Sequence, residues 1–443
     1  MKRLTLIAVA IAALAAVGCT NTPPRKNSGN SFACVVDGHF VRDSKPYRFV
    51  GANFWYGAIL ASTGEGGDRE RLARELDAMQ HVGIDNLRIL VGADGERGIP
   101  SKVEPTLQTA PGVYDDALLD GLDYLMAELG RRNMTAVLYL NNSWEWSGGY
   151  TQYLAWARGD KAPVPSIDGW PAYMAYAEEF IRSDEAQRLF DDHVRFILSR
   201  TNRYTGTAYT DDPAIFSWQI GNEPRAFSDS NKEAFAGWIE RTARLIRSLD
   251  PNHMISTGSE GRHGCEQDME LCRRIHELPE IAYVNCHIWP YNWGWITPEG
   301  MEAELAEAIR LTDDYIAQHE ALAGELGKPL VIEEFGFPRD GMRFAPGTPT
   351  VCRDAYYEHL FSLVCRAAAR QGALAGCNIW GWGGEAQPAS DHIFWQRGDD
   401  YTGDPAQEEQ GLNSVFASDE STLATIARAN RQLEKDRNNE DEI

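Results

Sequence analysis

Apolar runs and segments of helical periodicity alternate along this chain. The first helical segment, 68–81, begins with Asp68 as its N-cap and places leucine and methionine side chains on one face. The same periodicity predicts helices over 115–132, 183–199, 233–249, 301–325 and 353–371. Shorter apolar runs predict buried strands over 47–53, 86–91, 135–140, 214–220, 253–257, 281–287, 329–332 and 375–380. The chain therefore alternates between strand and helix through eight strands.

This alternation predicts an α/β fold, a parallel (β/α)8 TIM barrel. The alternative is an open doubly wound sheet, which would carry a glycine-rich phosphate loop after its first strand. Residues 51–55 (Gly-Ala-Asn-Phe-Trp) do not have that pattern. We expect one barrel domain over 32–433, followed by a charged tail over 434–443 that frays.

The N-terminal residues 1–19 have the features of an export signal. Lys2 and Arg3 precede an apolar run over 4–17 that is too short to span a membrane. Gly18-Cys19 closes the run and resembles a bacterial lipobox, in which Cys19 becomes the lipidated N-terminus; the alternative is an ordinary signal peptide with Cys19 incidental. A polar linker over 20–31 would then tether the domain. We expect an exported lipoprotein anchored in a bacterial membrane, the outer membrane, on its periplasmic side or at the cell surface.

Composition narrows the possible partners. The 443 residues carry a formal net charge of −23, which would repel phosphates and argues against nucleic acid. A neutral substrate fits this charge. The 13 tryptophans and 17 tyrosines indicate a large core, and some of them would offer aromatic faces to the apolar faces of sugar rings. We expect a monomer.

Cysteine and histidine spacing predicts neither a metal site nor a cofactor. The chain has no Cys-x-x-Cys pair and no His-x-x-x-His spacing, so zinc is not expected. Cys265 and Cys272 are close enough in sequence to pair in an exported protein. Cys286 and Cys377 lie in apolar runs and are expected to be buried thiols. The sequence leaves open whether Cys352 and Cys365 form a disulfide, and it assigns no disulfide partner to Cys34.

Two of the apolar runs end in a carboxylate. Glu223 follows the fourth run within Asn222-Glu223-Pro224, where the proline cannot extend a strand, and Glu334 follows the seventh. The carboxyl ends of barrel strands meet at one mouth. Glycoside hydrolysis needs two such carboxyl groups, about 5–5.5 Å apart for retention of configuration and about 6.5–9.5 Å apart for inversion. Because neighbours on a strand point to opposite faces, only one of Glu333 and Glu334 is expected to face the cleft.

Other residues at these strand ends suit a sugar site. Arg88 would keep Glu334 ionised if it lay beside it, and is otherwise a buried structural arginine. Asn222 could hydrogen-bond the 2-hydroxyl of a sugar, or simply form a turn. His287 could bridge substrate or a carboxylate. Trp380 could form the floor under the sugar, or belong to the core.

These same stretches resemble glycoside hydrolase family 5, and within it the endo-β-1,4-mannanases, over about 34–430. The matching stretches are 51–56 (GANFWY), 141–149 (NNSWEWSGG), 221–225 (GNEPR), 287–290 (HIWP), 333–336 (EEFG), 380–384 (WGWGG) and 403–411. The resemblance implies a retaining mechanism with Glu223 as acid/base and Glu334 as nucleophile. It implies that Arg225 binds mannose beyond the cleavage point.

Strand ends and matching stretches together yield the candidate substrate-binding residues. They are Trp55, Arg88, Asn142, Trp144, Asn222, Arg225, His287, Trp289 and Trp380. One position departs from the family pattern: Trp289 stands two residues after His287, where the wider family often has tyrosine. Either Tyr291 substitutes for it, or the nucleophile lacks that hydrogen bond.

The expected function is hydrolysis of internal bonds in mannan, glucomannan or galactomannan. An endo-β-1,4-glucanase on the same scaffold is the near alternative, because mannose and glucose differ only at C2. A non-catalytic, surface glycan-binding lipoprotein is the alternative from another class. The presence of both catalytic carboxylates argues against it.

Overall fold

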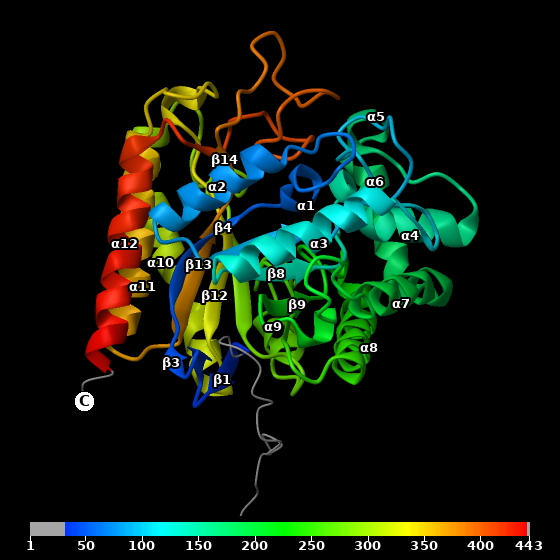
Figure 1. The fold of residues 1–443 in the computed structure, drawn as a ribbon, viewed down its shortest axis with the longest axis horizontal. Helices are drawn as coiled ribbons and strands as arrows, with labels where there is room; N and C mark the ends of the chain where they lie inside the picture. The colour runs from blue at the N-terminus through cyan, green and yellow to red at the C-terminus, as the bar shows by residue number, and fades with distance from the viewer. Residues whose placement is uncertain (1–31, 441–443) are drawn as a thin grey trace, which may run out of the picture. The chain divides into compact units, whose positions relative to one another are not determined.

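The computed structural model describes residues 32–440 and contains an eight-stranded parallel sheet (Figure 1). Its neighbours run in the order β10-β9-β8-β5-β4-β13-β12-β11. Backbone hydrogen bonds from Ala282 to Ile255 (2.8 Å) and from His287 to Glu260 (3.3 Å) link the two outermost strands, so the sheet closes as a barrel. The strands are β4 (Phe49–Asn53), β5 (Asn86–Leu90), β8 (Thr135–Tyr139), β9 (Ile215–Gln219), β10 (Met254–Ser256), β11 (Val284–Ile288), β12 (Leu330–Phe335) and β13 (Leu374–Ile379). Each overlaps one predicted run, and the predicted (β/α)8 TIM barrel is confirmed.

Six predicted helices are present, and three of them begin at a residue whose side chain caps the helix, Asp68, Asp115 or Ser183. Asp68 accepts the backbone N–H of Arg71 (2.8 Å), and Asp115 caps the next helix through Ala117 and Leu118. A side-chain oxygen at the N-cap pairs a backbone donor that the helix itself leaves free. These helices are α2 (Arg69–His81), α3 (Asp116–Arg131), α7 (Asp184–Leu198), α8 (Lys232–Leu249), α10 (Met301–Leu326) and α11 (Val351–Ala369).

Further elements extend the barrel beyond the predicted pattern. The additional helices are α1 (Gly57–Leu60), α4 (Gly149–Arg158), α5 (Pro165–Asp168), α6 (Trp170–Ala177), α9 (Met269–His276) and α12 (Glu420–Glu440), with 3-10 turns η1 (Glu145–Ser147), η2 (Glu178–Arg182), η3 (Tyr209–Asp211), η4 (Asp229–Asn231) and η5 (Asp340–Met342). Short strands are β1 (Cys34–Val36), β2 (His39–Arg42), β3 (Lys45–Pro46), β6 (Gln108–Ala110), β7 (Val113–Tyr114), β14 (Trp382–Gly384) and β15 (Val415–Phe416). The β1–β3 sheet lies at the lower ends of the barrel strands in Figure 1, where Phe40 packs on Phe49, Phe216 and Tyr283. That end is therefore filled by apolar packing.

The C-terminal segment is more ordered than its charge predicts. Helix α12 packs beside α11 and continues to Glu440, so the expected boundary between 433 and 434 falls inside a helix (Figure 1). Leu433 is buried, and the Asn430 side-chain amide donates to the backbone oxygen of Val50 (3.0 Å). These contacts fix the helix despite its charged sequence.

The predicted Cys265–Cys272 disulfide is not formed, because both residues are buried free thiols. The Cys272 sulfur instead contacts His276 Nδ1 (3.6 Å), and burial in the core already holds the segment. Cys286 and Cys377 are buried thiols, as predicted. The lipidation at Cys19, the signal and the linker lie outside the described residues. Within 32–440, none of the helices has the length and apolar composition needed to cross a membrane.

Candidate active site

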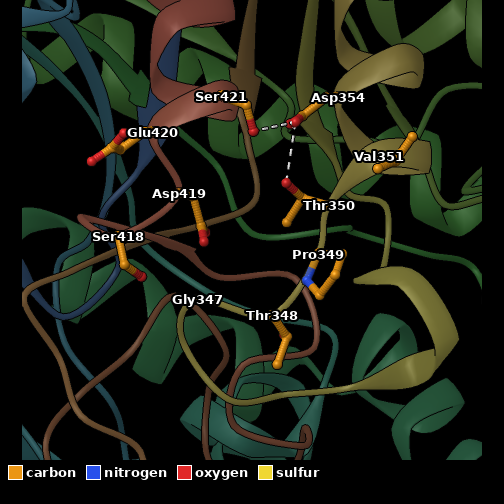
Figure 2. A pocket seen from close by; sticks show the side chains of 10 residues that line it. All are labelled: Gly347, Thr348, Pro349, Thr350, Val351, Asp354, Ser418, Asp419, Glu420 and Ser421. Carbon is orange, nitrogen blue, oxygen red and sulfur yellow. Dashed lines mark hydrogen bonds between the residues drawn. The ribbon is translucent and has the colours of Figure 1, made fainter.

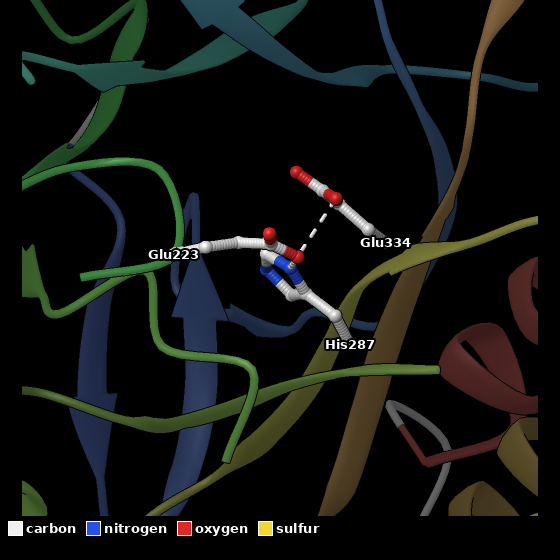
Figure 3. Close-up of side chains that lie close together, drawn as sticks. All are labelled: Glu223, His287 and Glu334. Carbon is white, nitrogen blue, oxygen red and sulfur yellow. Dashed lines mark hydrogen bonds and ion pairs between the residues drawn. The ribbon is translucent and has the colours of Figure 1, made fainter. Parts of the chain in front are cut away.

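The two predicted carboxylates meet at the mouth of the barrel, with one imidazole between them. Glu223 follows β9, Glu334 belongs to β12, and His287 reaches up from β11 (Figure 3). Nδ1 of His287 lies 2.8 Å from Oε1 of Glu223 and 3.2 Å from Oε2 of Glu334. One ligand atom from each of the three side chains falls within 4.8 Å of the others. Oxygens this close suit the retaining arrangement, with its two carboxyl groups about 5–5.5 Å apart, better than the inverting one, in which a water separates them.

Glu223 is held in an unusual backbone conformation. Its φ of 49° is in the left-handed region, which costs a non-glycine residue free energy and must be held by its surroundings. Its N–H donates to the oxygen of Gly258 (2.9 Å). A Cβ on Gly258 would lie 1.8 Å from the oxygen of Gly221, so only glycine permits this close approach. The indole N–H of Trp144 donates to the second oxygen of the Glu223 carboxylate.

Arg88 is the cation that holds Glu334, as predicted. It is fully buried, and its guanidinium donates to Glu334 and, on a second nitrogen, to Asn222 Oδ1 (2.8 Å). The Nε atom of Arg88 donates to Gln219 Oε1 (2.8 Å), and the guanidinium carbon Cζ lies 4.5 Å from the centre of the Tyr139 ring. Burial disfavours the charged guanidinium, but the Glu334 carboxylate raises the pKa of Arg88 above its usual value. A permanent positive charge therefore stands beside the predicted nucleophile.

Glu333 lies below Glu334 inside the barrel rather than on an outer face. Its carboxylate accepts from Tyr283 Oη (2.9 Å), Gln219 Nε2 (2.7 Å) and Asn285 Nδ2 (2.7 Å). Strict alternation fails here because the pairing of β12 with β13 shifts register between Ile332 and Phe335. Only Glu334 lines the cleft, as predicted, but both carboxylates are buried inside the barrel.

The proton of this site is shared by Glu223 and His287. Burial would raise the pKa of Glu223, but the hydrogen bond and charge of His287 lower it to about 2. Burial would lower the pKa of His287, yet the Glu334 charge and the hydrogen bond to Glu223 raise it to about 9. The opposite directions of these two pKa shifts favour an ionised Glu223 carboxylate that accepts a hydrogen bond from a protonated His287 imidazole, 2.8 Å away.

A cavity of about 470 Å³ contains most of the predicted substrate-binding residues. The predicted substrate-binding residues that line it are Trp144, Asn222, Arg225, Trp289 and Trp380, together with both catalytic candidates, Glu223 and Glu334. Arg88 and His287 are fully buried and act on the two carboxylates from behind. Asn222 has its oxygen on Arg88 and one amide hydrogen on Asn142 Oδ1 (3.2 Å), which leaves its other N–H for a substrate.

Two predicted substrate-binding residues instead support the site. Asn142 accepts the backbone N–H of Trp144 (3.0 Å) and donates to Ser147 Oγ (2.8 Å), so its amide is occupied. Trp55 is buried, does not line the cavity, and donates from its indole to the oxygen of Gly403 (3.1 Å). Each holds a loop that reaches the cavity.

The position where the family often has tyrosine is filled differently. Trp289 packs edge-on against Trp380 (5.9 Å between ring centres), and Tyr291 lines the cavity. Within residues 32–440 no tyrosine donates a hydrogen bond to Glu334, whose contacts come from Arg88 and His287. A Cβ on Gly336 would lie 2.8 Å from the Trp289 ring, so this glycine makes room for the larger side chain.

At the cavity wall Arg225 forms a charge pair with Glu260, a residue that the sequence motifs did not single out. Arg225 Nε donates to Glu260 Oε2 (2.7 Å), and its guanidinium lies over the Trp144 ring (5.2 Å). Burial is the main cause that raises the pKa of Glu260, to about 7. Arg225 is thus fixed at the cavity wall, next to the indole that contacts Glu223.

Sequence reasoning missed several residues of the site. Gln219 lies inside a predicted strand and carries no motif, although it links Arg88 to Glu333. Trp170 is on a helix that the strand pattern did not reveal. Glu408 lies in the 403–411 stretch that resembles mannanases; it is half-buried at the cavity wall, where desolvation raises the pKa of its carboxyl group above its ordinary value.

A larger hollow of about 610 Å³ lies elsewhere and shares no lining residue with the carboxylate cavity (Figure 2). Its two partly or fully buried acids are already paired: Asp354 accepts from Thr350 (3.1 Å) and Ser421 (2.5 Å), and Asp419 accepts from Arg339, while Glu420 is exposed to solvent. Satisfied carboxylates of this kind stabilise a fold and leave no group for chemistry.

The same site has the ligand types that could bind a divalent cation, from Glu223, His287 and Glu334. A cation there would face the charged guanidinium of Arg88 and would displace the proton on His287 Nδ1. The donor chemistry therefore fits proton transfer better than metal binding.

Comparisons with known proteins identify the family. Residues 30–438 match the family model described as glycoside hydrolase family 5, β-mannosidase-like. A putative mannan endo-1,4-β-mannosidase 9 of Oryza sativa subsp. japonica is 30% identical over 365 residues, which cover 79% of this chain and 82% of that protein. The crystal structure of a family 5 mannosidase from Rhizomucor miehei has 34% identity and a TM-score of 0.85, covering 92% of this chain and 99% of the other. An endo-1,4-β-mannanase from the same organism, at 22% identity and a TM-score of 0.66 over 91% of this chain and 100% of the other, shares the fold. The chain therefore belongs to glycoside hydrolase family 5, among its β-mannosidase-like members.

Proposed function

We propose that this protein is a retaining endo-β-1,4-mannanase that hydrolyses internal bonds of mannan, glucomannan or galactomannan. The observation that carries the proposal is the pair Glu223 and Glu334. One carboxylate oxygen of each lies within 4.8 Å of the other, and Arg88 forms an ion pair with Glu334 and not with Glu223. That asymmetry assigns the two roles. The carboxylate beside a permanent cation stays ionised as a nucleophile, and the one beside a protonated imidazole can receive a proton.

In the first step Glu334 attacks the anomeric carbon while Glu223 protonates the departing oxygen. Loss of the negative charge on Glu334 removes the main influence that keeps the pKa of His287 high. The proton on His287 Nδ1 can then pass to Glu223, 2.8 Å away, as the leaving group needs it. Proton release is thereby coupled to formation of the glycosyl–enzyme bond.

In the second step Glu223 takes a proton from water, whose oxygen attacks the anomeric carbon and frees Glu334. The restored charge of Glu334 raises the pKa of His287 again, so the proton returns from Glu223 to His287 Nδ1 and the starting state is recovered. The two displacements occur at opposite faces of the sugar, so configuration is retained overall. The free amide hydrogen of Asn222, held through Arg88, suits a hydrogen bond to the 2-hydroxyl that strengthens in the transition state.

A second candidate is a mannosidase that acts from chain ends, favoured by the name of the 34% identical Rhizomucor structure. Time courses on mannan, glucomannan, galactomannan and carboxymethylcellulose separate these possibilities. Endo-action lowers viscosity before much reducing sugar appears, whereas end-wise action releases mannose with little loss of viscosity. Preferential action on carboxymethylcellulose would favour the glucanase, and binding without cleavage would favour a non-catalytic glycan-binding protein.

We also propose that Cys19 carries a lipid that anchors the enzyme in the outer membrane, and that the enzyme is a monomer. The support for the anchor is the basic start, the short apolar run and Gly18-Cys19 at its end. Cell fractionation of wild type and Cys19→Ala tests it. Equal membrane association of both proteins would refute the anchor. Light scattering of a protein without residues 1–19 tests the monomer.

A further inference from the structure

One stretch on the cavity rim exposes more apolar surface than the fold requires. Helices α5 and α6 carry the side chains Ile167, Trp170 and Met174, which are 66%, 48% and 40% exposed (α5 and α6 in Figure 1). Trp170 and Met174 line the carboxylate cavity, whereas Ile167 does not. A large aromatic that is half exposed at the wall of a cavity is available to a ligand.

The Trp170 ring is fixed relative to the acid/base residue. It packs edge-on against Trp144, with ring centres 5.8 Å apart at 85°, and Trp144 in turn donates its indole N–H to Glu223. The next turn is tied down as well, since the buried Tyr173 donates its hydroxyl to the oxygen of Ser143 (2.5 Å). The ring is thus presented rigidly, which lowers the entropy cost of binding a ligand to it.

The position of Trp170 indicates which part of a sugar chain it meets. Trp380 donates its backbone N–H to the oxygen of Phe335 (2.9 Å), next to Glu334, and its indole N–H donates to Glu408 (3.4 Å), so these two mark the side of the nucleophile. Trp144 and Arg225 mark the side of Glu223, where the leaving group departs. Trp170 lies beyond Trp144 on that second side.

We propose that Trp170, with Met174 beside it, is a stacking platform for a sugar unit of the leaving chain that lies beyond the units next to the cleavage point. An indole face packs well on the apolar C–H face of a pyranose ring. The platform belongs to the cleft of the proposed mannanase and therefore rests on that function. It makes the enzyme prefer long chains that extend across the rim.

The test is the dependence of kcat/KM on chain length, measured with manno-oligosaccharides of increasing size. Wild type should gain activity as chains become long enough to reach the rim. Trp170→Ala should lose about two- to tenfold on long chains, as expected for one aromatic contact, and stay near wild type on the shortest substrate that is cut. Trp170→Phe should keep part of the gain. Ile167→Ala, an exposed apolar change on the neighbouring helix outside the cavity, should match wild type.

Binding supplies a second measurement that does not depend on turnover. Calorimetric titration of the Glu334→Ala protein, with and without Trp170→Ala, should show weaker binding of long oligosaccharides only. An equal loss at all lengths would mean that Trp170 merely braces Trp144, and no loss at any length would mean that no sugar reaches it; either overturns the platform. If wild type cleaves no mannan at all, the proposed function itself fails, which is a different result.

Discussion

Glu333→Gln tests the chain of contacts that runs from the barrel interior to the nucleophile. Glu333 accepts from Gln219, Gln219 accepts from Arg88, and Arg88 donates to Glu334. The substitution keeps the size of the side chain and one oxygen. It replaces the other oxygen by an NH2 group. This group can only donate hydrogen bonds, but its neighbours are donors too.

The expected cost follows from the bonds that change. The remaining oxygen can keep the bond from Tyr283, while the new amide faces the NH2 groups of Gln219 and Asn285, now 2.7 Å from the carboxylate. Hydrogen bonds to charged groups contribute about 1.5–3 kcal/mol each, and flipping the partners would break their own bonds. Partial relaxation recovers some of this energy. We expect the free energy of unfolding to fall by about 3 kcal/mol.

Activity should fall too, although Glu333 does not line the cleft. Without its anchor, Gln219 no longer fixes Nε of Arg88, and the guanidinium can shift away from Glu334. Small displacements of catalytic groups reduce rates strongly, so we expect kcat to fall by on the order of tenfold with a smaller change in KM.

Urea denaturation measures the stability change, and initial rates on mannan measure kcat and KM. The matched control is Glu299→Gln, the same chemical change at an exposed position. It should leave both quantities at wild-type values. Unchanged stability and kcat in Glu333→Gln would refute the positioning chain, and complete inactivity combined with a turning-over Glu334→Ala protein would reverse the assignment of the nucleophile.

Three other predictions concern the reacting groups. Glu334→Ala should lose turnover, and azide should restore only the formation of an inverted glycosyl azide, identified by NMR; a retained product would contradict its role. Glu223→Ala should accumulate the glycosyl–enzyme on an activated substrate, visible by mass spectrometry, and azide should then yield a retained product, whereas inversion would exclude Glu223 as the acid/base. Because the pKa of His287 rises from 6.5 to about 9, its charged form stabilises the fold fully below about pH 6.5 and this contribution is lost as pH rises through about 9. Unfolding free energies at about pH 6 and about pH 10 should therefore differ less in His287→Asn than in wild type, and an equal difference in both proteins would refute the linkage.

The sequence was sufficient for the barrel and for the two catalytic candidates because both depend on local patterns. A buried strand is an apolar run, and the run before Glu223 stops at Pro224, which marks the strand end directly. Asp68 caps its helix through its own side chain, a contact that spans three residues. Arg88 could be proposed as the partner of Glu334 because a barrel brings its strand ends together.

The parts that were not predicted depend on long-range packing. The tail over 434–443 was expected to fray because its charges are visible in the sequence, whereas residues up to Glu440 continue helix α12, which the Asn430 contact with Val50 anchors further upstream. Gln219 has no distinctive neighbours, and its importance arises only from the two groups on other strands that it connects. The Cys265–Cys272 pair was inferred from proximity in sequence, whereas the fold buries each as a thiol.

A stretch that resembles a family motif contains residues of two kinds, and only geometry separates them. In the stretch 141–149, Trp144 lines the cavity and its indole N–H donates to Glu223. Asn142 does not line the cavity; its side-chain oxygen accepts the backbone N–H of Trp144 and its NH2 group donates to Ser147. In the stretch 51–56, Trp55 holds the 403 loop and does not reach the cavity. A site that depends on hydrogen bonds between loops constrains the residues that hold the loops as tightly as those that touch substrate. Substitution of Asn142 should therefore act on catalysis through Trp144, in the same way that Glu333 acts through Gln219 and Arg88.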